Sequence, residues 1–421
     1  MSAAGKKIAI VGSGISGLVC AYLLAKRNQV SVFEAANEIG GHTATKRVCT
    51  AQGNYDIDTG FIVFNDRTYP NFMRLLSTLG VAYQPTEMGF SVSCRRTAFE
   101  YAGTSVNGLF AQRKNVFSVE HWRMLLDIVR FNKDCIARYE QNALPEGQTL
   151  GEFLSAQGYS QRFRDFYILP MVSAIWSSSL ETAAAMPLVF FIRFFYNHGL
   201  LTVTQQPQWY TIVGGSNKYL GPLTESFKDT IFTNCPITRV ERLDAGVRIV
   251  SKQFGEQDFD EVIFACHSDQ ALQLLTDASA AESDILGAIP YAPNQVVLHS
   301  DASVLPRAGT AWASWNYLLP AQNTNEAVLT YNMNILQRLI SAEVFCVSVN
   351  AGSVIDPTKV YGTYNYSHPM FTLGSLTAQS RWGEISGHRH THFCGAYWRN
   401  GFHEDGVVSA IRVAAALGEI W

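Results

Sequence analysis

Six residues near the start of the chain, Gly12-Ser13-Gly14-Ile15-Ser16-Gly17, have the types and spacing of a loop that binds a dinucleotide. This G-x-G-x-x-G pattern follows a short apolar run, and an acidic residue, Glu34, comes 22 positions after Gly12. In such a loop Gly12 allows a tight turn, Gly14 lets backbone N–H groups approach a pyrophosphate, and Gly17 allows close helix packing. Glu34 would then accept hydrogen bonds from a ribose diol. The alternative is a glycine turn that serves only the packing of an α/β core.

The elements that must position this loop follow from the hydrophobic pattern around it. Residues 6–11 predict a buried strand, residues 16–27 a helix, and residues 30–33 a second strand that ends at Glu34. Further helices are predicted over residues 69–80, 119–139, 150–158, 187–200 and 405–417. Further strands are predicted over residues 237–243, 247–252, 262–266, 296–299, 311–318, 327–333 and 344–349, with an acidic turn around 258–261.

The composition indicates a globular protein and excludes several classes. Among 421 residues, 47% are hydrophobic and only 16% are charged, which excludes a disordered or coiled-coil chain. The net charge of −3 gives no attraction to nucleic acid. Eight cysteines without a C-x-x-C pair indicate reduced thiols in the cytoplasm. The run Ile8–Val11 is too short for an export signal, and Met186–Tyr196, which contains Arg193, is too short to span a bilayer. We expect a cytoplasmic protein without a transmembrane segment, and contact with the inner membrane face stays open.

Several further motifs resemble one known family. They are Gly40-Gly41-His42-Thr43, Asp58 to Asn65, Gly214-Gly215-Ser216, Cys235-Pro236-Ile237, and Phe393-Cys394-Gly395 leading to Gly401–Gly406. Together with the glycine loop they resemble the flavin-containing amine oxidase superfamily, which includes enzymes similar to phytoene desaturase and protoporphyrinogen oxidase. More narrowly, Val297–Asp301, Ala311–Tyr317 and Gly395–Trp398 resemble a bacterial subgroup often encoded beside methyltransferases similar to cyclopropane-fatty-acyl synthase.

The resemblance implies non-covalently bound FAD and assigns residues to it. The residues it implies for the ADP half are Gly12, Ser13, Gly14, Ile15, Ser16, Gly17, Glu34 and Ala35, and the pyrophosphate turn is Gly40, Gly41, His42 and Thr43. It further implies Gly60, Phe61 and Ile62, Ile237 beside the adenine, and Gly395, Asp405, Gly406 and Val407 in a C-terminal flavin loop. Asp405 is expected at the N-terminus of the last helix, where the dipole stabilises negative charge on the flavin, or as a plain N-cap.

Two departures argue against an amine substrate. Oxidases of the superfamily usually place a lysine near the flavin on the second sheet, whereas this chain has none between Lys252 and Lys359 and carries Asn294, Gln295 and His299 there. Phe402 stands where amine oxidases usually have a tyrosine of the aromatic cage. A later second G-x-G-x-x-G is also missing, which argues against a separate NAD(P)H domain.

Other constellations have competing interpretations. His388, His390 and His392 alternate, which on a strand would give one face for a metal, but a solvated face is favoured and no metal is expected. His267-Ser268-Asp269 contains triad residue types, although a loop after a strand is favoured. Cys394 is expected to pack beneath the cofactor. The aromatic helix with Phe190, Phe191, Phe194 and Phe195 is expected in the core, with the lining of an apolar substrate channel as the alternative.

These observations predict an α/β fold in which a Rossmann-like FAD-binding domain interleaves with a substrate domain of mixed sheet plus helices. The FAD-binding domain is expected from residues 1–78, 205–287 and 380–421, and the substrate domain from 79–204 and 288–379. We expect an oxidoreductase that takes hydride from an apolar, fatty-acyl or phospholipid-acyl substrate, with His403 and Glu404 as catalytic candidates. A methyltransferase is the expected protein partner. The alternatives are an amine oxidase that produces imine and hydrogen peroxide, and a non-catalytic FAD-binding partner of the methyltransferase.

Overall fold

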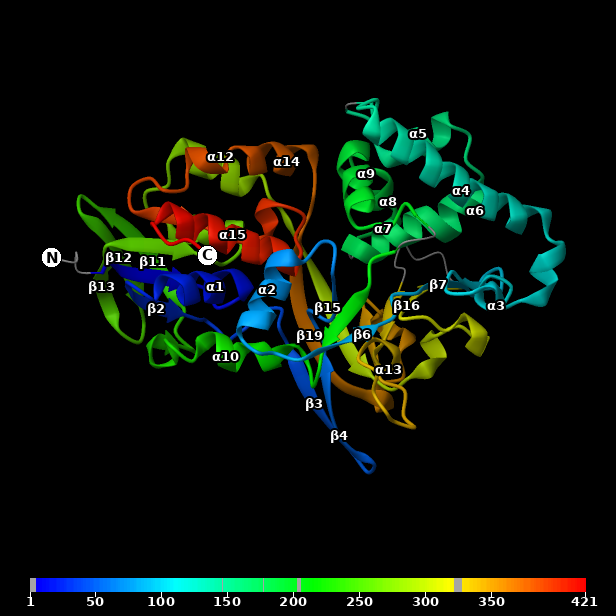
Figure 1. The fold of residues 1–421 in the computed structure, drawn as a ribbon, viewed down its shortest axis with the longest axis horizontal. Helices are drawn as coiled ribbons and strands as arrows, with labels where there is room; N and C mark the ends of the chain where they lie inside the picture. Colours follow the sequence, from blue (N-terminus) through cyan, green and yellow to red (C-terminus); the bar gives the residue numbers. More distant parts are fainter. Residues whose placement is uncertain (1–4, 146, 177, 203–205, 322–327) are drawn as a thin grey trace.

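The computed structural model describes residues 5–145, 147–176, 178–202, 206–321 and 328–421. The chain forms two bodies side by side, and both termini lie in the same body (Figure 1). Each body has its own hydrophobic core, one around Ile8, Val32 and Phe264 and the other around Phe131, Phe191 and Val347. No helix of the described ranges has both the length and the apolar character that crossing a bilayer requires.

The first body is built on a five-stranded parallel sheet with the order β10-β2-β1-β14-β20. Its strands are β1 (Lys7–Val11), β2 (Gln29–Phe33), β10 (Ile231–Phe232), β14 (Glu261–Phe264) and β20 (Thr391–Phe393). The continuous apolar run Ile8–Val11 suits the centre of a parallel sheet, because both of its faces are covered. The predicted strand–helix–strand unit is confirmed, with α1 spanning Ile15–Leu24.

Helices and a small sheet surround this parallel sheet. The helices are α2 (Pro70–Thr78), α10 (Leu220–Thr224), α11 (Ser268–Leu274), α12 (Ala280–Gly287), α14 (Leu373–Ser380) and α15 (His403–Ala416), and α15 packs along α1 (Figure 1). The small antiparallel sheet consists of β11 (Ile237–Leu243), β12 (Gly246–Ser251) and β13 (Gly255–Phe259). The predicted acidic turn at 258–261 is wrong, because Asp258 and Phe259 belong to β13 and only Asp260 separates it from β14.

The second body is built on a seven-stranded sheet with the order β19-β15-β18-β17-β16-β7-β8. Its strands are β7 (Phe90–Cys94), β8 (Phe99–Ala102), β15 (Tyr291–His299), β16 (Trp315–Leu319), β17 (Val328–Asn332), β18 (Cys346–Val349) and β19 (Val360–Pro369). The predicted strands at 296–299, 327–333 and 344–349 are confirmed with small shifts, although Ala327 lies outside the described residues. The strand predicted over 311–318 begins only at Trp315, because Gly309–Ala311 forms a 3-10 turn.

Helices complete the second body. They are α3 (Val106–Leu109), α4 (Val119–Glu140), α5 (Leu150–Ala156), α6 (Gln161–Phe163), α7 (Leu169–Trp176), α8 (Leu180–Ala184), α9 (Leu188–Asn197) and α13 (Met333–Leu336). Ser118 caps α4 by accepting a hydrogen bond from the His121 N–H at 3.3 Å. The predicted helices over 119–139, 150–158 and 187–200 are confirmed.

Short strands join the two bodies. The hairpin of β3 (Thr45–Thr50) and β4 (Gly53–Asp58) contributes Val48 and Ile57 to the core of the second body, although both residues lie within the 1–78 segment expected in the FAD-binding domain. A three-stranded sheet consists of β5 (Phe64–Asn65), β9 (Trp209–Ile212) and β6 (Tyr83–Thr86).

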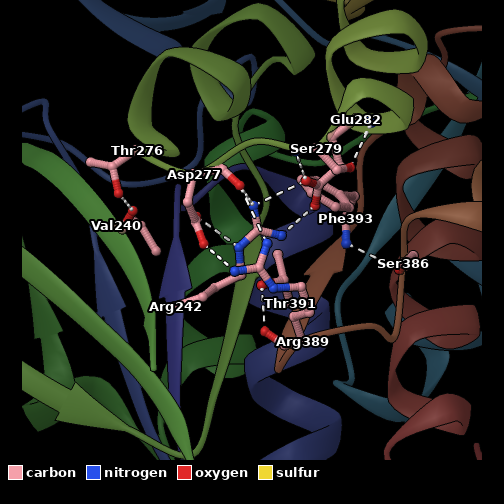
Figure 2. A network of polar contacts seen from close by, with 10 residues as sticks. All are labelled: Val240, Arg242, Thr276, Asp277, Ser279, Glu282, Ser386, Arg389, Thr391 and Phe393. Carbon is pink, nitrogen blue, oxygen red and sulfur yellow. Dashed lines mark hydrogen bonds and ion pairs between the residues drawn. The ribbon is translucent and has the colours of Figure 1, made fainter. Parts of the chain in front are cut away.

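A buried ion-pair network fixes the small sheet against the helices beside it (Figure 2). The Arg242 guanidinium on β11 donates to Glu282 at 2.5 and 3.0 Å and to the Asp277 carboxylate at 2.9 Å. Its side chain is only 2% exposed and that of Glu282 only 4%. Arg389, which precedes β20, donates to Asp277 from the other side. The network therefore ties β11 to the loop before α12 and to the last strand of the parallel sheet.

Candidate active site

The glycine loop between β1 and α1 has the geometry that its sequence predicts. Gly12 has φ +106°, and a Cβ there would lie 2.8 Å from the Ala265 carbonyl oxygen. A Cβ on Gly17 would lie 2.1 Å from the Gly12 carbonyl oxygen. The tight turn at Gly12 and the close helix packing at Gly17 are therefore confirmed.

Gly14 differs from its neighbours because its missing side chain faces open space. No atom lies within 4 Å of the position that a Cβ would take. Gly14 is also the N-cap of α1, so the first backbone N–H groups of that helix, from Ile15 and Ser16, lie next to this space. A helix N-terminus beside a glycine cradle suits an anionic phosphate group.

Glu34 lies at the end of β2 and supports the same loop. Its carboxylate accepts hydrogen bonds from Ser13, from N–H at 3.0 Å and from Oγ at 2.5 Å, and from the Ala36 N–H at 2.8 Å. Its backbone carbonyl accepts from the Cys235 N–H at 2.8 Å, which brings the segment leading to Ile237 beside it. Ala35, the next residue, is exposed. The residues expected around the adenosine half thus lie close together.

The Gly40-Gly41 turn packs on Gly14, and the Gly60-Phe61 segment packs in turn on His42. Gly40 donates its N–H to the Ser13 carbonyl at 2.9 Å, and a Cβ on Gly41 would lie 3.2 Å from the Gly14 Cα. A Cβ on Gly60 would lie 2.2 Å from the His42 carbonyl oxygen, and Phe61 N–H donates to the same oxygen at 2.7 Å. Ile62, by contrast, is buried in the core of the second body.

The C-terminal loop, Gly395 to Gly406, packs beside the glycine loop although it lies near the other end of the sequence. Gly395 donates its N–H to Ser409 Oγ at 3.0 Å. Gly406, near the start of α15, packs so closely on α1 that a Cβ would lie 2.7 Å from Ile15 Cγ2 and 2.9 Å from Ser16 Oγ. Val407 is fully buried. The N-termini of α1 and α15 therefore meet beside the glycine cradle.

Asp405 lies in the first turn of α15, as predicted, but it is not the N-cap of that helix. The helix begins at His403 with Phe402 as N-cap, and the Asp405 carboxylate accepts the Phe402 N–H at 2.9 Å. Burial raises the pKa of Asp405 to about 6 despite this hydrogen bond. The side chain thus stabilises the first turn of the helix.

A chain of hydrogen bonds links three segments at the junction of the two bodies. Tyr219 Oη lies 2.5 Å from Thr43 Oγ1 and 2.9 Å from His403 Nε2. The His403 ring stacks on Phe61 with 3.8 Å between the ring centroids. Burial, with a further contribution from His42, lowers the pKa of His403 to about 3. His403 is therefore a neutral imidazole held in one orientation.

Glu404, the second predicted catalytic residue, has a different environment. Its carboxylate accepts the Phe72 N–H at 2.8 Å, the Asn71 N–H at 3.1 Å and the Asn71 side-chain amide at 2.6 Å. These N–H groups belong to the first turn of α2, which otherwise lacks a capping side chain. Both oxygens are thereby engaged, and the geometry gives Glu404 the role of fixing α15 to α2.

Strand β19 contributes residues that were absent from the predicted site. The His42 ring centroid lies 5.2 Å from that of Tyr366 and 5.3 Å from that of His368. Tyr366 Oη lies 2.9 Å from Thr59 Oγ1, and His368 Nδ1 lies 2.9 Å from Asn294 Nδ2. The period-two spacing of Tyr364, Tyr366 and His368 was the available signal, since alternate residues of a strand share a face.

The imidazoles at this junction are all neutral. Burial, followed by the influence of His368 and His267, lowers the pKa of His42 to about 3. Burial and His267 lower the pKa of His368 to about 4. The junction is thus polar in its hydrogen-bonding groups but carries no imidazolium charge.

Asp58 organises the Gly214-Gly215-Ser216 motif. Its carboxylate accepts the Ser216 N–H at 2.8 Å, Ser216 Oγ at 2.9 Å and Thr45 Oγ1 at 2.6 Å. Burial raises the pKa of this carboxyl to about 6. These hydrogen bonds fix the loop that leads from β4 to Gly60.

The remaining sequence motifs have structural explanations. His390 has φ +60° and precedes β20, so the alternating strand imagined for His388, His390 and His392 does not form. His267 is the N-cap residue of α11, and its ring stacks on Tyr291 with 4.3 Å between centroids. Cys394 is fully buried, its Sγ 3.8 Å from Cys20 Sγ, and the neighbouring thiol and burial raise its pKa well above the usual value.

The aromatic helix α9 packs against the C-terminal loop. Phe190, Phe191, Phe194 and Phe195 are all buried, which confirms their place in the core. The Phe194 ring stacks on Phe402 with 5.0 Å between centroids and 22° between planes. Since Phe402 directly precedes His403, the core of the second body reaches the edge of the candidate site.

Comparison with known proteins agrees with this geometry. Residues 10–79 match the family described as an NAD(P)-binding Rossmann-like domain. Solved structures of similar fold include cyclohexylamine oxidase from Brevibacterium oxydans IH-35A, with TM-score 0.68, 16% identity and 98% of each chain covered. This chain has the fold of that oxidase. Putrescine oxidase with bound putrescine aligns with TM-score 0.70 and 14% identity over 98% of this chain and 99% of its own. The CLA-producing fatty acid isomerase from P. acnes aligns with TM-score 0.69 and 12% identity over 97% and 98%.

Proposed function

We propose that this chain is an enzyme, an oxidoreductase that binds FAD without a covalent bond. The observation that carries the proposal is the glycine cradle: Gly14 faces open space where the N-termini of α1 and α15 meet. Gly40, Gly41 and Gly60 supply close-packed backbone around it. The chain's fold is shared with two amine oxidases over almost the whole length. When bound, FAD would supply a two-electron acceptor for hydride.

The residues that would hold FAD follow from this placement. Backbone N–H groups of Ile15 and Ser16 would face the pyrophosphate, and Glu34 would face the adenosine ribose. Ile237 would lie beside the adenine. The segment from Gly395 to Gly406 would border the flavin ring, where the buried Tyr397 hydroxyl and Trp398 indole N–H form no hydrogen bond to any other part of the described chain.

We propose an apolar, acyl-chain-bearing substrate for this site. The buried carboxylates nearest the junction, Asp58, Glu404 and Asp405, all accept hydrogen bonds from the protein itself. Together with the neutral imidazoles, this leaves an environment in which burying an ammonium group is costly. The CLA-producing fatty acid isomerase has a similar fold, and its name states a fatty acid as the compound on which it acts.

Three side chains would then position the reacting carbon atoms. His403, held by Tyr219 and Phe61, is unprotonated and would accept the proton only as a weak base, because burial lowers its pKa to about 3. His42 and His368 would contribute further uncharged hydrogen-bonding groups. The reaction would remove a hydride and a proton from adjacent carbons and leave a double bond. Glu404 would act only through the position of α15.

The test is anaerobic reduction of the purified yellow protein by a panel of lipids and amines. Fatty acids, acyl thioesters and phospholipids should bleach the flavin absorbance, and binding should tighten with chain length at about 0.8 kcal/mol per buried methylene. His403→Gln should slow bleaching at least about 100-fold while FAD stays bound. Glu404→Gln serves as the matched control and should affect thermal stability more than bleaching.

A second candidate is an amine oxidase, favoured by the shared fold with two proteins of that name. Rapid bleaching by primary amines with release of hydrogen peroxide, and no response to any lipid, would establish it in place of the acyl proposal. A chain that binds FAD but responds to neither class would be the non-catalytic partner of a methyltransferase. Copurification from cytoplasmic and membrane fractions would test that partner and the expected cytoplasmic location.

We propose domain boundaries of 1–78, 205–287 and 380–421 for FAD binding, and 79–204 and 288–379 for the substrate. The β3–β4 hairpin, which packs in the core of the second body, and α14, which packs beside α12 of the first, depart from this division. Limited proteolysis with and without FAD would test them, because bound FAD should protect the first set of segments. Cleavage that ignores these boundaries would refute them.

A further inference from the structure

Helix α4 carries apolar side chains on an outer face that no other part of the described chain covers. Val119, Trp122, Leu126 and Val129 recur at intervals of three and four, so they share one face of the helix. They are 82%, 46%, 67% and 57% exposed. The opposite face, with Met124, Phe131 and Cys135, is buried in the core. The helix is therefore apolar on both sides, which is unusual for a surface helix.

Two more exposed apolar residues lie next to this face of α4. Val116 and Phe117, directly before α4, are 41% and 89% exposed. We call these six residues, Val116, Phe117, Val119, Trp122, Leu126 and Val129, the outer α4 face. The other exposed large apolar residues of the described ranges, such as Ile340 and Ile420, stand apart in the sequence. Scattered apolar residues are normal on a surface, whereas a continuous patch marks an interaction site.

Basic side chains border the outer α4 face. Lys114, Arg123 and Lys133 are exposed, and within the described ranges they form no ion pair. Of the nearby acids, Glu120 pairs with Arg162 at 2.9 Å and Asp127 with Arg130 at 3.4 Å, and Asp134 accepts a hydrogen bond from Tyr159 at 3.2 Å. A hollow of about 950 Å³ lies beside the start of the helix. Its lining includes the basic residues Lys114, Arg123 and Arg162 and the acids Glu120 and Asp165.

We propose that the outer α4 face docks on an anionic lipid bilayer. An apolar stripe bordered by unpaired cations is the chemistry that binds the headgroup region, where apolar side chains enter the acyl boundary and cations meet lipid phosphates. In Figure 1 the helix lies at the outer end of the second body, away from both termini, so this end of the molecule can approach a flat surface. The three unpaired cations match the negative charge of anionic lipid headgroups.

The binding can be measured by flotation of the full chain with vesicles of phosphatidylcholine, with or without phosphatidylglycerol. The wild type should float with the anionic vesicles and less so at high salt. Phe117→Ser with Leu126→Ser should weaken binding at least about tenfold. Arg123→Gln with Lys133→Gln keeps the apolar stripe and should weaken binding about fivefold per charge.

Matched controls separate this effect from a general loss of surface hydrophobicity. Ile340→Ser and Ile420→Ser remove side chains that are 96% and 90% exposed elsewhere, and they should float like the wild type. All variants should unfold at the wild-type temperature, because the replaced side chains make few buried contacts. The assay involves no turnover, and the replaced side chains lie on the surface of α4 or directly before it, outside the candidate active site, so a loss of flotation in these variants distinguishes docking from uptake of a phospholipid substrate.

Three results would overturn the proposal. The first is a wild type that binds no vesicle, and the second is a Phe117→Ser/Leu126→Ser variant that floats as well as the wild type. The third is a dimer in solution that becomes monomeric in that variant, which would make the outer α4 face a contact between two copies of the chain.

Discussion

Replacement of Gly14 by valine should remove the cofactor and leave the fold intact. Gly14 has φ −66° and ψ 177°, an extended conformation that valine adopts without strain. A Cβ at this position meets no protein atom within 4 Å. The same addition at Gly17 would place a Cβ 2.1 Å from a backbone oxygen, which requires the loop to move.

The expected changes in unfolding free energy and in FAD affinity of Gly14→Val follow from the environment of Gly14. At the N-cap, valine is less favourable than glycine by up to about 1 kcal/mol. Valine also restricts the backbone of the unfolded chain more than glycine does, which stabilises the folded state by about 0.4–1 kcal/mol and offsets part of this cost. The unfolding free energy of Gly14→Val should therefore stay within about 1 kcal/mol of the wild type. A backbone N–H to phosphate hydrogen bond spans about 3 Å, which leaves no room for two methyl groups, so FAD affinity should fall at least about 100-fold.

The assay combines urea unfolding of the FAD-free protein with titration of FAD by fluorescence. Gly309→Val is the matched control, because Gly309 also faces open space but lies in the second body. It should leave both quantities unchanged, whereas Gly17→Val should lower stability and FAD binding together. A Gly14→Val protein that is purified yellow, with about one FAD per chain, would refute the placement of the pyrophosphate.

Three further predictions concern other parts of the molecule. Intact mass after acid precipitation should equal that of the bare chain, because Cys394 is buried against Cys20 and its pKa is raised; a mass increase equal to FAD would contradict this. Arg242→Met should lower the unfolding free energy by about 3–5 kcal/mol, measured in urea, because it leaves buried Glu282 unpaired; a loss below about 1 kcal/mol would show that the pair is not isolated from solvent. Burial acts to raise the pKa of Glu261, but hydrogen bonds with His392 and Lys6 outweigh it and lower the pKa to about 2 from an ordinary 4.5. This group contributes up to about 3 kcal/mol above pH 4.5 that is lost as the pH falls toward 2, so the stability difference between wild type and Glu261→Gln should vanish at low pH.

The parts of the site that could be predicted from sequence are those fixed by local geometry. The turn at Gly12 and the helix contact at Gly17 depend on residues within a few positions, and Glu34 on one strand–helix–strand unit. The α/β architecture could also be predicted, because the strand segments Ile8–Val11 and Val262–Phe264 are continuously apolar.

The parts that could not be predicted depend on residues distant in sequence. Glu404 was predicted as a catalytic candidate, but its carboxylate accepts hydrogen bonds from the N–H groups of α2, 332 positions earlier at Phe72. Strand β19 was missed because its exposed and half-buried positions alternate without a strongly apolar face. Arg389 and His390 both have positive φ, which ended the expected histidine strand in a way that residue types alone do not reveal.

The parallel sheet of the first body has a consequence for the order of folding. Its central strand β1 is among the first segments made, whereas β20 and the loop before α15 follow only after the whole second body. Such long-range pairings are slow, since a large loop must close before they form. During synthesis the glycine loop therefore forms before its C-terminal neighbour Gly406 has been made. Until β20 pairs with β14, the edge of β14 is exposed and can pair with an incorrect strand. A ligand that contacts both the glycine loop and the segment at Gly406 would bind only chains in which these two segments are already packed together, and would therefore stabilise the correctly folded form.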